Sequence, residues 1–111
     1  MDLWNELEAK RRYLLEAVKN LQRSGKDYAE AEMNYKVLLR QEILKLRDEG
    51  VAVGVISLIA YGIPEVARAR FKRDVAEANY KANQEYINAV KLEMRIIESQ
   101  LAREWSVAND G

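Results

Sequence analysis

Apolar residues recur along the first half of the chain with the spacing of one face of an α-helix. Within residues 3–48 one set returns every seven residues, and some of its members are followed by a second set that starts four positions later. These positions are Leu7, Leu14, Val18, Leu21, Tyr28, Tyr35, Leu39 and Leu46. Acidic and basic residues four apart, such as Glu32 and Lys36, lie on the other side and are typical of a solvated helix face. The pattern predicts a helical arm over about residues 3–48.

Gly25 interrupts this arm and leaves two interpretations open. A glycine inside a helix costs about 1 kcal/mol relative to alanine, which a long packed helix can absorb. Because the heptad register passes from Leu21 to Tyr28 without a slip, we favour a kinked but nearly collinear helix. The alternative is two helices that meet at Gly25, since Asp27 and Glu30 have the spacing of a helix N-terminal capping box.

The connector at residues 49–63 is apolar and contains glycines. We expect Gly50 to end the first arm in the left-handed conformation, residues 51–53 to be extended, and residues 55–60 to form a short helix or turn. Pro64 then suits the first position of a helix, because its missing N–H needs no partner there. The connector is shorter than the roughly 20 apolar residues that a membrane-spanning helix needs.

The second arm is predicted over about residues 64–105, where neither proline nor glycine occurs after Pro64. The two arms are similar in length, so we expect an all-α fold in which they pair as a long antiparallel, coiled-coil-like helical hairpin. The length of the chain is typical of a single domain. We expect the tail, residues 106–111, to be frayed.

The second arm carries two apolar stripes, more than one partner helix would cover. The first stripe alternates steps of four and three residues: Ala76, Tyr80, Asn83, Ile87, Val90, Met94, Ile97 and Leu101. The second stripe lies beside it: Phe71, Val75, Ala78, Ala82, Ala89, Leu92 and Ile96. The first arm can cover one stripe, and a second copy of the chain is the simplest cover for the other. We therefore predict a homodimer that forms a helical bundle.

The first stripe, from Tyr80 to Leu101, is our candidate dimer or packing seam. Asn83 is a candidate for fixing the register of this seam, because one polar residue in an apolar seam penalises slipped pairings. The alternative to the dimer is a monomer of three helices, in which a break at Gly25 folds the first arm back over both stripes.

The composition excludes several kinds of chemistry. The chain has no histidine and no cysteine, which removes the commonest general base, thiol nucleophiles and the usual transition-metal ligands. Its carboxylates form no catalytic constellation, and no glycine-rich phosphate loop is present. We expect no enzyme activity, no cofactor, no metal and no small-molecule substrate. The acidic, amphipathic start differs from a signal peptide, so we expect a cytoplasmic protein that does not bind membranes.

Two segments are candidate contact sites. The 18 basic and 18 acidic residues cancel, so nucleic-acid binding would need a local patch. The start of the second arm offers one, with a weak helix-turn-helix pattern before it: Arg68, Arg70, Lys72 and Arg73. The connector can plug the end of the hairpin, or it can be a docking tip for a protein with these anchors: Ile56, Leu58, Ile59 and Tyr61.

Three segments resemble small uncharacterised helical proteins of tailed bacteriophages and prophages of Gram-positive bacteria. They are residues 25–32 (GKDYAEAE), 46–50 (LRDEG) and 91–105 (KLEMRIIESQLAREW). The resemblance implies a phage-encoded accessory protein in the host cytoplasm and carries over no catalytic residues. We expect a structural or adaptor protein that binds another protein. The alternatives are an accessory DNA-binding protein of phage replication or recombination and a small inhibitor of a host enzyme.

Overall fold

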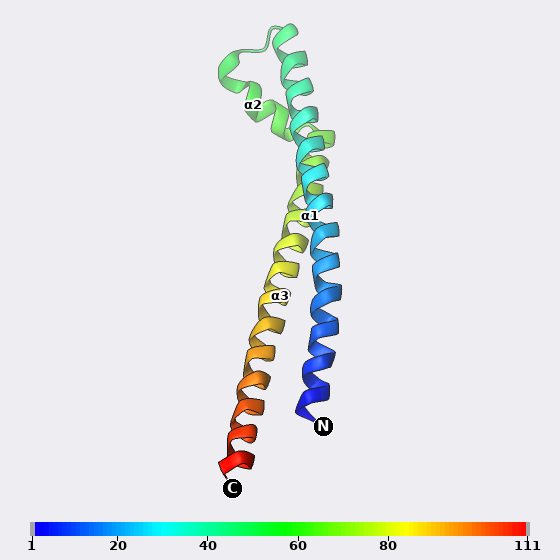
Figure 1. Ribbon diagram of the computed structural model, residues 1–111. Coiled ribbons are helices and arrows are strands. Elements are labelled where there is room, and N and C mark those ends of the chain that lie inside the picture. Colours follow the sequence, from blue (N-terminus) through cyan, green and yellow to red (C-terminus); the bar gives the residue numbers. More distant parts are fainter. Residues whose placement is uncertain (1, 111) are drawn as a thin grey trace. The chain divides into compact units, whose positions relative to one another are not determined.

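The computed structural model describes residues 2–110, which form three α-helices (Figure 1). They are α1 (Leu3–Asp48), α2 (Val53–Gly62) and α3 (Pro64–Asp110). No strand occurs within this range. The predicted all-α fold, with two long helices joined by a short helical connector, is confirmed.

Contacts along the chain group into two compact units, and both long helices contribute to each. Among the described residues, unit 1 comprises residues 2–23 and 81–110, and unit 2 comprises Ser24–Tyr80. In unit 2, Tyr28 of α1 packs against Tyr80 of α3, and Tyr35, further along α1, lies beneath Arg73, which is earlier on α3. The two helices therefore run antiparallel in this unit.

The same direction holds in unit 1. Lys10 of α1 pairs with Glu93 of α3, whereas Leu21, later on α1, shares a surface depression with Gln84 and Asn88, which are earlier on α3. The predicted antiparallel helical hairpin is thus confirmed in each unit.

Helix α1 is continuous through Gly25, so the alternative of two helices meeting there is wrong. A side chain at Gly25 would begin 3.1 Å from Cε1 of Tyr80, closer than ordinary van der Waals contact. The Tyr80 ring also lies 6.0 Å, centroid to centroid, from the ring of Tyr28. Gly25 therefore makes room for an aromatic side chain of α3, and this packing offsets its low helix propensity.

Local hydrogen bonds explain where α1 begins and ends. The Asp2 carboxylate accepts a hydrogen bond of 3.1 Å from the backbone N–H of Trp4, as an N-cap does. At the other end, Gly50 has φ of 83°, its N–H donates to the carbonyl of Arg47, and the N–H of Val51 donates to that of Leu46. This is the Schellman arrangement, and it confirms the predicted left-handed Gly50.

Two predicted boundaries need correction. Helix α2 begins at Val53 and ends at Gly62, so it is longer than the predicted 55–60 segment, and Val53 is helical. Helix α3 does begin at Pro64, but it continues to Asp110, so a frayed tail from residue 106 is wrong for residues 106–110. No helix breaker interrupts this stretch, and the Asn109 amide donates to the Trp105 carbonyl. Gly111 lies outside the described residues.

The predicted heptad positions of α1 face the packed side, with one exception. Leu7 and Tyr35 are buried, and the others are half-buried apart from Val18, which is exposed. Small residues complete the buried face and recur every seven positions: Ala17, Ser24 and Ala31. Their short side chains let the backbones of two helices approach closely.

Candidate interaction surfaces

The first stripe of α3 is an internal packing surface. Ile87, Val90 and Ile97 are buried, with 7%, 3% and 4% of their surface exposed. The rest of the stripe is half-buried: Ala76, Tyr80, Asn83, Met94 and Leu101. The residues predicted as a dimer or packing seam are thus covered within a single chain, so they do not present a free surface to a second copy.

The second stripe is exposed in each unit. In unit 2, Phe71 and Val75 are 70% and 52% exposed. In unit 1, Leu92 and Ile96 are 57% and 52% exposed. The three alanines of the stripe are exposed as well. One of the two predicted stripes therefore remains without cover in the single chain.

Helix α2 has a buried side and an exposed apolar side. Ile56 and Ala60 are buried, so Ile56 belongs to the core of unit 2, which corrects its prediction as a docking anchor. Leu58 is 75% exposed, and Ile59 and Tyr61 are also exposed. The buried residues thus agree with the plug interpretation, and the docking tip stays a prediction for the three exposed residues.

Arg73 is engaged inside unit 2. Its guanidinium lies 4.6 Å from the centre of the Tyr35 ring, 2.9 Å from a carboxylate oxygen of Asp74 and 3.5 Å from one of Glu32. The hydrogen bond to Asp74 raises the pKa of Arg73 above its already high ordinary value, and Glu32 adds to this electrostatically. An arginine held in this way is a structural link between α1 and α3.

The rest of the basic run is partly neutralised. Arg68 pairs with Glu65 at 3.5 Å, and the guanidinium of Arg70 lies 5.8 Å from the centre of the Tyr61 ring. Lys72 is exposed. The four cations therefore do not form one unpaired patch, and DNA binding stays a prediction that titration with duplex and single-stranded DNA at low salt would test.

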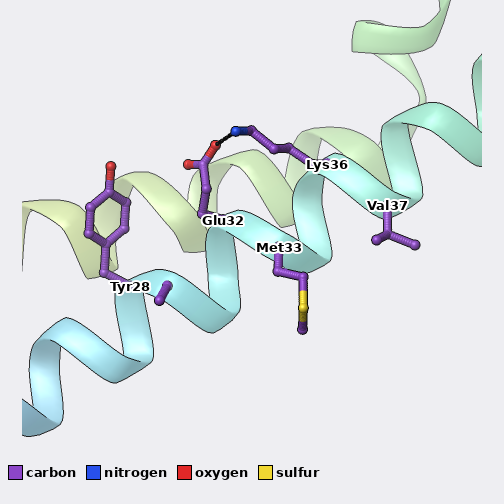
Figure 2. A pocket seen from close by; sticks show the side chains of 6 residues that line it. Tyr28, Glu32, Met33, Lys36 and Val37 are labelled. Atoms are coloured by element: carbon purple, nitrogen blue, oxygen red, sulfur yellow. Dashed lines mark ion pairs between the residues drawn. The ribbon is translucent and has the colours of Figure 1, made fainter.

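A surface of α1 outside the predicted sites also carries exposed apolar residues. Figure 2 shows Met33 and Val37 with Tyr28, Glu32 and Lys36 around one pocket on α1, where Glu32 is joined to Lys36 by an ion pair of 3.3 Å. Met33 and Val37 are 58% and 52% exposed. Apolar residues at helical spacing away from the predicted heptad face were the signal that could have revealed this surface.

Among the described residues, acidic side chains form no metal-binding group and buried polar side chains are satisfied. No group of three or more acidic side chains in the range 2–110 could hold a metal ion. Within the same range, every buried side-chain nitrogen or oxygen has a hydrogen-bond partner. The prominent features of the chain are thus exposed apolar and charged surfaces.

No protein-family model, no curated protein and no solved structure matches the chain. None of its described helices combines the length and apolar character that crossing a membrane requires.

Proposed function

We propose that the protein is a non-enzymatic structural or adaptor protein that acts through protein–protein contacts as a helical homodimer. The observation that carries the proposal is the exposure of the second stripe of α3, next to a first stripe that the chain itself covers. Single exposed apolar residues are ordinary, but a stripe at helical spacing is a packing surface. A second copy carries the same stripe, so a two-fold interface buries both at once.

The strongest part of this surface in unit 1 is formed by Leu92 and Ile96. Burial of a large aliphatic side chain stabilises an association by about 1.5–3 kcal/mol. A two-fold dimer contains each residue twice, so these positions contribute enough to decide whether the copies associate.

The test is sedimentation velocity of the wild-type chain and of the double variant Leu92→Glu/Ile96→Glu. We expect a wild-type dimer and at least a hundredfold weaker association of the variant, because four carboxylates would have to lose water at the interface. A wild-type chain that stays monomeric at about 100 μM, where even an interface worth only 6 kcal/mol would populate dimers, contradicts the proposal.

The matched control is Gln84→Glu/Asn88→Glu. Both residues are exposed on the polar face of α3 in the same unit, and the change adds the same two charges. We expect this variant to dimerise like the wild-type chain. Equal loss of association in both variants would mean that net charge, and not the apolar stripe, controls the assembly.

The resemblance to small phage proteins supports an accessory role in the host cytoplasm. A pull-down from host lysate with the dimeric chain as bait, compared with the Leu92→Glu/Ile96→Glu variant, tests the adaptor role. A partner retained by the dimer alone would support an adaptor that needs two copies.

A further inference from the structure

Two neighbouring depressions follow the outer side of α1 in unit 2. The first has a volume of about 520 Å³ and is lined by Tyr28, Ala29, Glu32, Met33, Lys36 and Val37. The second has a volume of about 340 Å³ and is lined by Lys36, Leu39, Arg40, Ile43, Leu44 and Arg47. They share Lys36, so they form one continuous surface, which we call the α1 groove.

The second depression has an apolar floor and a cationic rim. Leu39, Ile43 and Leu44 contribute the apolar part, and no acidic residue lines it. Arg40 and Arg47 are exposed, and neither guanidinium has an ion-pair partner among residues 2–110. Lys36, the third cation of this depression, is paired with Glu32, and elsewhere in the unit Lys45, Arg68 and Arg73 are paired with carboxylates. The two free arginines therefore leave uncompensated positive charge beside an apolar floor.

The exposed apolar residues of the groove have the spacing of a helix-binding surface. Met33, Val37 and Leu44 lie four and seven residues apart, which places them on one side of α1. Side chains at such spacing form ridges and grooves into which a second helix can pack. Amphipathic helices dock on apolar grooves of this kind through anchors at similar spacing.

We propose that the α1 groove binds an amphipathic helix of another protein, whose apolar anchors are flanked by aspartate or glutamate. The apolar anchors would fill the two depressions, and the carboxylates would pair with Arg40 and Arg47. Charge complementarity favours this partner over a neutral or basic helix. Duplex DNA would supply phosphates but nothing apolar for the floor, and a lipid surface favours a broad projecting apolar face over hollows. The groove lies on α1, so this proposal does not depend on dimerisation through α3.

The test uses two displayed libraries of helical peptides with randomised large apolar residues at anchor positions four and seven residues apart. One library carries glutamate at the flanking positions, and the other carries lysine. The bait is the full chain. We expect binders from the glutamate library only, and their affinity should fall with rising salt because the charged rim is solvated.

A charge reversal makes the test specific. In Arg40→Glu/Arg47→Glu, the selected acidic peptides should bind about tenfold more weakly or worse, and their lysine counterparts should bind better than to the wild-type chain. The control Lys91→Glu/Arg95→Glu makes the same change of charge at exposed positions on α3. It should leave peptide binding within about twofold. Circular dichroism confirms that each variant is helical.

Several outcomes would overturn the proposal. One is that neither library yields a binder, and another is that acidic peptides bind equally well when their anchors are replaced by serine. A third is that duplex DNA or vesicles with anionic phospholipid bind the wild-type chain and lose binding in Arg40→Glu/Arg47→Glu, while the peptides do not bind. Loss of self-association in this variant alone would assign the groove to a second copy instead.

Discussion

Ile96 and Ile97 are neighbours on α3 with opposite environments. Ile97 belongs to the first stripe and has 4% of its surface exposed, whereas Ile96 belongs to the second stripe and is 52% exposed. One to two turns earlier, Val90 and Leu92 differ in the same way, at 3% and 57%. Residues of equal hydrophobicity on one helix are thus separated into core and surface by a rotation about its axis.

The buried side of α3 is therefore narrow, since it includes only the first of the two stripes. One long partner helix covers one stripe of α3, because two antiparallel helices bury only the sides that face each other. Any other apolar stripe stays exposed unless a further element covers it. The exposed stripe therefore reflects the small number of helices in the fold.

The largest contrast is expected between Ile97→Ala and Ile96→Ala. Truncation at the buried position removes packed methyl groups and should lower the free energy of unfolding by about 2–4 kcal/mol. Truncation at the exposed position should change it by less than about 0.5 kcal/mol when the chain is monomeric. Urea unfolding followed by circular dichroism at low protein concentration measures both.

The same Ile96→Ala measurement at high protein concentration tests whether a dimer buries Ile96. A dimer that buries Ile96 makes the variant less stable than the wild-type chain only where the wild-type chain is dimeric. Equal losses from the two alanine variants at low concentration would mean that Ile96 is buried in the monomer, contrary to the structure.

A second contrast lies within α2. Ile56→Ser removes packed methyl groups and places a hydroxyl in the core of unit 2, so it should cost about 2 kcal/mol or more, whereas Leu58→Ser acts at a residue that is 75% exposed and should be nearly neutral. Thermal unfolding of the two variants provides the measurement. A marked loss of stability in Leu58→Ser would show that the outer face of α2 is also a plug. Loss of a captured partner with unchanged stability would support the docking tip.

A smaller contrast separates two arginines of the basic run. Arg73→Gln removes the contact with Tyr35 and the ion pair with Glu32 and should cost about 1 kcal/mol. Arg68→Gln removes a solvent-exposed pair with Glu65 and should cost close to nothing. Chemical denaturation compares them. Similar effects of the two substitutions would argue against a structural role for Arg73.

The smallest effect is expected for Lys10, which links α1 and α3 in unit 1. Its hydrogen bond to Glu93 raises the pKa of Lys10 above the ordinary value of 10.5 and outweighs partial loss of water. A raised pKa in the folded chain means that the stabilisation is complete below pH 10.5 and is lost as the pH rises through the folded-state pKa. Melting temperatures of the wild-type chain and Lys10→Met, compared from about pH 9 to about pH 12, should therefore converge at the alkaline end. A difference that does not depend on pH would contradict this reading.

Features with a local cause were predicted well from the sequence. The helix end at Gly50 and the helix start at Pro64 follow from backbone geometry, and the structure has both. Features that depend on a residue distant in the sequence were not predicted. Gly25 leaves space for the ring of Tyr80, which is far away in the sequence. No residue near Gly25 indicates that an aromatic ring will pack there.

The candidate surfaces divide in the same way. The second stripe of α3 can be recognised in the sequence from its helical spacing. The α1 groove cannot, because its apolar residues alternate with charged residues that are typical of a solvated helix face. The packing of Arg73 on Tyr35 was hidden for a different reason. It joins residues on two helices, whose register along each other no single helix reveals.

The helical fold, the start of both long helices, the end of the first one and the two apolar stripes of α3 can all be predicted from the sequence. These features depend on propensity, caps and periodicity, which act over a few residues. Other features become clear only in the packed fold: which stripe is covered, that α1 passes unbroken through Gly25, and that Ile56 is buried while Leu58 is exposed. Those outcomes depend on the rotation and register of helices that are distant in sequence, and the burial of apolar surface between them sets both.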